Sequence, residues 1–139
     1  MSTAAERLVA ARAELNARCN TIEEAYEFML AYAGQGMASD AGSAKGTQVR
    51  EYLTKAAAAM ADLSALAETF ANNTDADVAP YAAFMAVIDR DARASRAAVG
   101  IVLAQSGISS QLIDNLNASI HLRALLTDLF LVDEALKGL

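Results

Sequence analysis

Apolar side chains recur every three or four positions along almost the whole chain, and no stretch sustains the alternation of period two that a half-buried strand requires. Alanine occupies 33 of the 139 positions, whereas proline occurs once. Alanine loses no side-chain entropy in a helix, and proline would interrupt one. The sequence therefore predicts an all-α fold.

Turn and capping signals divide this pattern into long helices joined by short connections. Such helices are typical of an up-and-down four-helix bundle, so we expect residues 1–139 to form one helical-bundle domain. The four expected helices span about residues 3–33, 47–72, 78–105 and 110–137.

The first expected helix contains a second possible start. Thr3 with Glu6 and Thr21 with Glu24 both have the spacing of a capping box, in which side chains bond to free backbone amides. The apolar positions nevertheless keep their spacing of seven through Asn20. One continuous helix and a helix broken near Asn20 both stay open.

The stretch GQGMASDAGSAKGT, residues 34 to 47, has the composition of a phosphate-binding loop. Its order does not fit, because Gly46 follows Lys45 instead of preceding it and a helix, not a strand, comes before. We interpret residues 35–46 as a flexible loop between two helices, long enough to serve as a lid.

The last expected helix is apolar around more of its circumference than packing within one bundle requires. Such a helix is either covered by the rest of its own chain or shared between two chains. We interpret it as the contact of a homodimer, with the covered core helix as the alternative. The predicted interface residues are Leu122, Leu125, Leu129, Phe130, Val132 and Leu136.

Charge and cysteine content narrow the possible partners. The net charge is −6 and the isoelectric point is near 4.6, so the protein repels phosphate groups on average. We therefore expect no binding to nucleic acid. The single cysteine, Cys19, excludes an internal disulfide and a cysteine zinc site, which fits a cytoplasmic location. We expect no membrane insertion, because charged residues interrupt every long apolar window.

His121 is the one histidine, and this limits the chemistry that the chain can support. A di-iron bundle needs two Glu-x-x-His pairs, so that class is excluded. No nucleophile can be paired with a base except through His121. We therefore expect no metal, no cofactor and no catalytic residue, and we favour a protein that is not an enzyme.

A polar track, consisting of Asp114, Asn117, His121 and Asp128, follows one face of the last expected helix. It is either a solvated edge or part of a site. In the second case, alanine-rich helices could leave a ligand pocket near His121. Its predicted lining is His121, Asn117, Tyr26, Tyr81, Phe84 and Met85.

The stretch LNASIH, residues 116 to 121, resembles the Arg-Asn-x-x-x-His motif of HEPN domains. Asn117 and His121 match the motif, whereas Leu116 stands in the position of the arginine. The resemblance implies a dimeric helical bundle that processes nucleic acid, and the missing arginine bears directly on RNA cleavage. The neighbouring IHLRALL also resembles the histidine helix of sensor-kinase dimerisation domains, without the proline and the acidic or amide neighbour usual there.

Three hypotheses follow from the sequence. The leading one is a non-catalytic helical bundle that acts through protein–protein contacts, as an adaptor, regulator or accessory factor. The second is a bundle that binds a small molecule or cofactor near His121. The third is a HEPN-like dimer acting on nucleic acid.

Overall fold

A computed structural model describes residues 3–73 and 75–138, and these residues form helices and turns without any strand. The prediction of an all-α fold is confirmed. The described helices are α1 (Ala4–Ala33), α2 (Ala44–Met60), α3 (Leu63–Ala71), α4 (Ala79–Leu103), α5 (Ser110–Ala118) and α6 (Ile120–Leu136).

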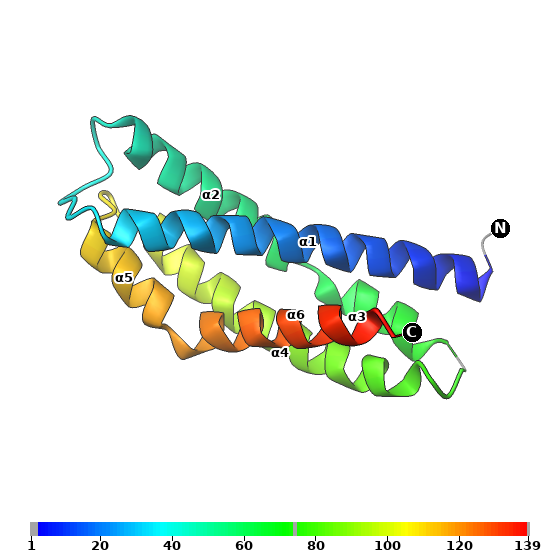
Figure 1. Ribbon diagram of the computed structural model, residues 1–139. Helices are drawn as coiled ribbons and strands as arrows, with labels where there is room; N and C mark the ends of the chain where they lie inside the picture. The colour runs from blue at the N-terminus through cyan, green and yellow to red at the C-terminus, as the bar shows by residue number, and fades with distance from the viewer. Residues whose placement is uncertain (1–2, 74, 139) are drawn as a thin grey trace.

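The two longest helices, α1 and α4, organise the molecule (Figure 1). Each packs against α2, α3, α5 and α6. The pair α2 and α3 therefore connects α1 to α4 on one side, and the pair α5 and α6 does so on the other. The shared interior is apolar, with Tyr32 and Phe70 as its largest fully buried side chains.

The expectation of four uninterrupted helices is wrong at two places. The second expected helix breaks after Met60, where Ala61 is extended (φ −78°, ψ 146°) and Asp62 adopts a left-handed conformation (φ 55°). The last expected helix breaks at Ser119 (φ −57°, ψ 128°). Neither break contains the glycine or proline that usually marks one.

The first helix is continuous. Thr3 caps it as expected, because its hydroxyl accepts a hydrogen bond from the Glu6 amide at 3.1 Å. Thr21 does not start a new helix, since its hydroxyl instead donates to the carbonyl of Ala17 at 3.1 Å. A threonine inside a helix can bond to the preceding turn in this way without ending it.

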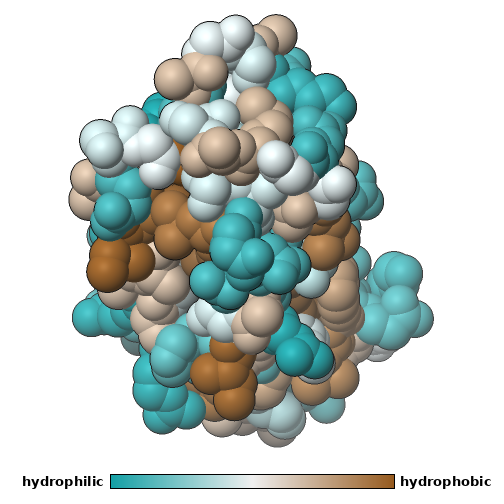
Figure 2. Space-filling model, turned by 90° about the vertical axis from the view of Figure 1, so that its left-hand side faces the viewer, coloured by the Kyte–Doolittle hydropathy of each residue, from teal (hydrophilic) through white to brown (hydrophobic). Residues whose placement is uncertain are grey.

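The connection between α1 and α2, predicted as a flexible loop, is hydrogen-bonded to the segment before α5. The amide of Met37 donates to the Ser110 hydroxyl, and the Ser110 amide donates to the Met37 carbonyl, both at 2.8 Å. Asp40 accepts the Ile108 amide at 2.7 Å. This end of the molecule faces the viewer in Figure 2, where hydrophobic patches are separated by hydrophilic ones.

No described helix has a basic residue in its own last turn, and the ends of three of them, α2, α4 and α6, have a partner elsewhere. Each receives an arginine from another helix, which satisfies free carbonyl groups and places positive charge at the negative end of the helix dipole. The donors and acceptors are Arg12 with the Leu136 carbonyl (2.7 Å), Arg18 with Ala61, and Arg50 with Leu103 (3.2 Å) and Gln105 (2.9 Å).

Candidate functional site

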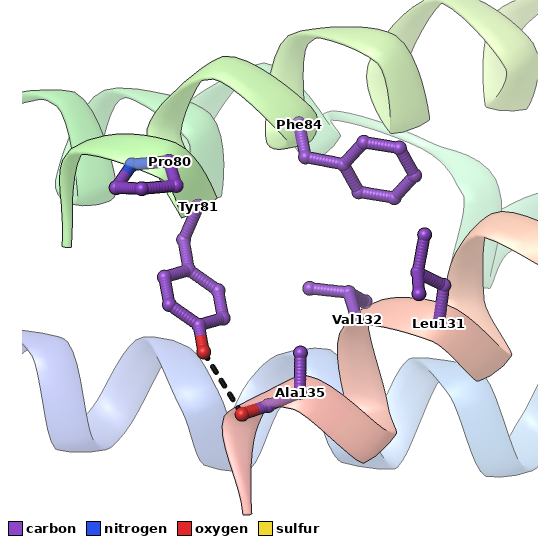
Figure 3. A pocket seen from close by; sticks show the side chains of 6 residues that line it. All are labelled: Pro80, Tyr81, Phe84, Leu131, Val132 and Ala135. Carbon is purple, nitrogen blue, oxygen red and sulfur yellow. Dashed lines mark hydrogen bonds between the residues drawn. The ribbon is translucent and has the colours of Figure 1, made fainter. Parts of the chain in front are cut away.

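An open apolar groove of about 350 Å³ lies where the start of α4 meets the end of α6 (Figure 3). The side chains of Phe84, Leu131 and Val132 point into the space between the two helices. The Tyr81 hydroxyl donates to the Ala135 carbonyl at 2.8 Å. The groove is lined by Pro80, Tyr81, Phe84, Leu131, Val132 and Ala135.

Local sequence explains how α4 places its part of the groove. Pro80 lies in the first turn of α4, where its missing amide costs no helical hydrogen bond and its fixed φ favours the helix. The next residue, Tyr81, packs its ring on Phe70 of α3, with centroids 6.5 Å apart. The aromatic wall is thus supported from behind by a second helix.

Helix α6 carries exposed apolar side chains near the groove and at its other end. Near the groove, Leu131 is 58% exposed and Phe130 is 54% exposed, and Ile120, at the start of the helix, is 75% exposed. The other large apolar side chains exposed by about half or more in the described residues are Val9, Leu30 and Ile101, which lie on α1 and α4. More of these exposed side chains thus lie on α6 than on any other described helix.

Most of the predicted interface residues lie inside this chain's own core. Helices α4, α1 and α5 cover the inner face of α6, so these side chains have no free surface for a second chain. This burial speaks against their assignment to an interface, since a full-circumference apolar pattern does not distinguish the inner from the outer face. The buried members are Leu122, Leu125, Leu129, Val132 and Leu136, whereas Phe130 is exposed.

The six residues predicted to line a ligand pocket do not form one pocket. His121 is exposed, whereas Met85 is fully buried and Asn117 is almost so. Tyr26 lies half-buried on α1. Of the six, Tyr81 and Phe84 line the apolar groove.

The break at Ser119 explains why the polar track is not one face. It separates Asp114 and Asn117 on α5 from His121 and Asp128 on α6. Asp114 and His121 are exposed, whereas Asn117 points into the protein. Leu116, at the arginine position of the HEPN-like motif, is buried in the core.

A pair of carboxyl groups lies across the contact between α4 and α6. Asp128 faces Asp91, and the Asp128 Oδ2 atom is buried with no hydrogen-bond partner among the described residues. Burial, followed by the contact with Asp91, raises the pKa of Asp128 to about 7, and the charge of Arg90 opposes this. The sequence pattern placed Asp128 on the polar track and did not indicate its contact with Asp91. A charged residue inside the apolar run of α6 was the available signal.

Two further buried polar side chains have no hydrogen-bond partner in the described part of the chain. These are the Ser95 hydroxyl on α4 and both polar atoms of the Asn117 side chain on α5. In the described residues, no three histidine, cysteine or acidic side chains are grouped so that they could hold a metal ion. Among the described helices, none is both long and apolar enough to cross a bilayer.

Cys19 is buried, and its thiol contacts Glu23 with 3.0 Å between Sγ and Oε1. Burial first, and then the bond to Glu23, raises the pKa of Cys19 to about 12. Because the thiolate is the reactive form, we expect a disulfide reagent at pH 8 to react at least about 100-fold more slowly with the folded protein than with the unfolded one. Absorbance of the released thiol, with and without urea, measures both rates. Equal rates would contradict the burial of Cys19.

Scans of protein-family models and searches of curated proteins and of solved structures found no match to this chain.

Proposed function

We propose that this protein is a non-catalytic four-helix bundle that acts through protein contacts, as a homodimer with an adaptor, regulatory or accessory role. The four members of the bundle are α1, α2 with α3, α4, and α5 with α6. The outer face of α6 and the groove beside it form the proposed contact, which we call the α6 face. It comprises Ile120, Phe130, Leu131 and the groove.

The observation that carries this proposal is the exposed apolar surface of α6. Leu131 is 58% exposed although it lines an apolar groove. Burying apolar surface gains about 25 cal/mol per Å², so a partner that covers Leu131 and fills the groove gains binding free energy. An apolar groove with exposed apolar side chains beside it is the kind of surface at which proteins interact.

The charges along α6 favour a second copy in antiparallel orientation. Arg123 is exposed near the start of the helix, and Asp133 and Glu134 lie near its end, where Lys137 pairs with Glu134 at 2.9 Å and leaves the charge of Asp133 unopposed by that pair. An antiparallel copy brings the basic start of each helix toward the acidic end of the other. A parallel copy would place like charges side by side, which is unfavourable.

We expect Leu131→Glu to weaken self-association at least about 10-fold, because it places a charge where apolar surface is buried. Leu30→Glu is the matched control, since Leu30 is a leucine of similar exposure on α1, and its expected effect is small. Sedimentation equilibrium over a wide concentration range measures both dissociation constants. A strictly monomeric wild-type protein, or equal effects of the two variants, would overturn the dimer.

Reversing charges tests the orientation. Arg123→Glu alone should weaken the dimer, and adding Glu134→Arg in the same chain should restore it. Failure of the double variant to recover would contradict the antiparallel arrangement while leaving the α6 face as the contact.

A second candidate function is favoured by the same groove, whose volume suits a small apolar ligand and which contains Tyr81. Native mass spectrometry of the protein as purified distinguishes the two. A dimer without added mass supports the protein contact, and a monomer carrying a bound small molecule supports the ligand-binding function.

A further inference from the structure

The contact between α4 and α6 is largely apolar, apart from the hydrogen bond of Tyr81 to Ala135 at one end and two carboxyl groups in its middle. On α4, Ile88 and Ala92 are fully buried on either side of Asp91. On α6, Leu125 and Leu129 are buried on either side of Asp128. Asp91 and Asp128 are themselves partly buried and face each other. The Asp128 Oδ2 atom is itself shielded from water.

If Asp91 and Asp128 are both ionised, they cannot form a hydrogen bond with each other. Carboxylate oxygens only accept hydrogen bonds, so two facing carboxylates repel and form no bond. This is the condition of the Asp128 Oδ2 atom, which is buried without a donor among the described groups. A single proton between the two groups supplies the missing donor and removes the repulsion.

The neighbouring charged groups do not cancel the repulsion between the two carboxylates. Asp91 and Arg90, both on α4, are the described groups that act on Asp128, and Arg90 only partly offsets the burial and the Asp91 charge. From α1 and α5, which also pack against α6, no described charged group shifts Asp128. His121, on α6 itself, is exposed.

We propose that Asp91 and Asp128 form a proton-dependent latch between α4 and α6. With one proton shared, the carboxyl groups are hydrogen-bonded and hold the two helices together. When that proton is lost, the carboxylates repel each other and the helices loosen at this point.

The latch is placed to act on the apolar groove. Leu131 and Val132 follow Asp128 by three and four residues, which is the next turn of α6. Phe84 precedes Asp91 by two turns on α4. Loosening the helices at the carboxyl pair therefore changes the spacing of the groove walls.

The sign of the pH dependence follows from the direction of the pKa change. The pKa of Asp128 is about 7 in the folded protein, against an ordinary value of 3.8. The folded state thus binds the proton more tightly, so stability is highest at low pH and falls as pH rises from about 4 to 7. Between pH 5 and 8, we expect the unfolding equilibrium constant to rise by roughly 10- to 100-fold from this group.

The experiment compares urea unfolding of the wild-type protein, Asp128→Asn and Asp114→Asn between pH 5 and 8. Asparagine is nearly isosteric with aspartate and donates to Asp91 at every pH. The unfolding equilibrium constant of Asp128→Asn should therefore not rise between pH 5 and 8. Asp114→Asn is the control for removing an exposed carboxylate, and it should keep the rise. Equal pH dependence in wild type and Asp128→Asn would overturn the latch.

Two measurements on the wild-type protein keep the test independent of how the variants fold. The Asp128 carboxyl carbon should titrate near pH 7 by NMR, and titration near pH 4 would overturn the proposal. Amide exchange, corrected for its intrinsic pH dependence, should quicken about 10-fold in α6 above pH 7 while the middle of α1 stays protected. A uniform change throughout the chain would also overturn it, because the latch is local.

Discussion

Gly46→Ala is expected to destabilise the protein by about 3 kcal/mol, at the upper end of the range for a side chain without space. Gly46 lies in the first turn of α2, and its amide donates to the Ser43 hydroxyl at 2.9 Å. A Cβ atom there would stand 1.7 Å from the carbonyl oxygen of Asp40. That oxygen is backbone, so either the loop before α2 or the start of α2 must move. Urea unfolding measures the change.

Gly100→Ala is the matched control for this prediction. Gly100 lies inside α4 and is exposed, and nothing stands within 4 Å of a Cβ atom added there. Alanine in an open helical position is better than glycine by about 1 kcal/mol, so this variant should be slightly more stable than wild type. Similar losses in both variants would contradict the close approach of Asp40 to α2.

Arg50→Met is expected to destabilise the protein by about 3 kcal/mol, because it removes several partners at once. The Arg50 guanidinium bonds to the Asp40 carboxylate at 2.5 Å and to the carbonyl groups at the end of α4. The Asp40 side chain is only 10% exposed, so without Arg50 its charge loses a partner that water replaces poorly. Thermal and urea unfolding measure the loss, and Arg50→Lys should recover only part of it, since lysine lacks the planar fork.

The contact between Arg50 and Asp40 also predicts how stability changes at low pH. The hydrogen bond from Arg50, and then the amide of Ile108, hold the pKa of Asp40 below its ordinary value of 3.8. A carboxyl group with a lowered pKa stabilises the folded state above its ordinary pKa and loses this contribution as pH falls through the lowered value. The difference between wild type and Arg50→Met should therefore shrink below about pH 4. This window lies below that of Asp128, so the two groups can be separated.

Arg93→Met is the control for removing an arginine. Arg93 pairs with Asp89 at 3.0 Å, but its side chain is 72% exposed. Exposed ion pairs of this kind contribute well under about 1 kcal/mol, so the variant should unfold almost as wild type does. An equal loss in the Arg50 and Arg93 variants would indicate that Arg50 does not fasten α2 to the end of α4.

The helices that the sequence predicts best are those whose ends carry their own local signals. The expected bounds of the first helix agree closely with Ala4–Ala33, because Thr3 supplies a cap and Gly34 follows the last turn. The break at Ala61 lacks such a signal. There, the Ala61 carbonyl receives Arg18 of α1, a contact between residues 43 positions apart. A partner so far away along the chain cannot be predicted from the local sequence pattern.

The candidate site was only partly predictable for a related reason. The apolar excess of α6 was visible in its sequence, and Phe130, one of the interface residues predicted from it, is 54% exposed. Which side faces inward depends on the break at Ser119, which resets the orientation of everything after it. The contact of Asp128 with Asp91 likewise depends on how α6 lies against α4.

The arginine that reaches the end of α6 has a consequence for the order in which the chain can fold. Arg12 lies on α1, and its acceptor, the Leu136 carbonyl at the end of α6, lies 124 residues later. Contacts of such sequence separation form late, because the long intervening loop must be closed first. During folding, the Arg12 guanidinium therefore stays hydrated until α6 has packed against α1.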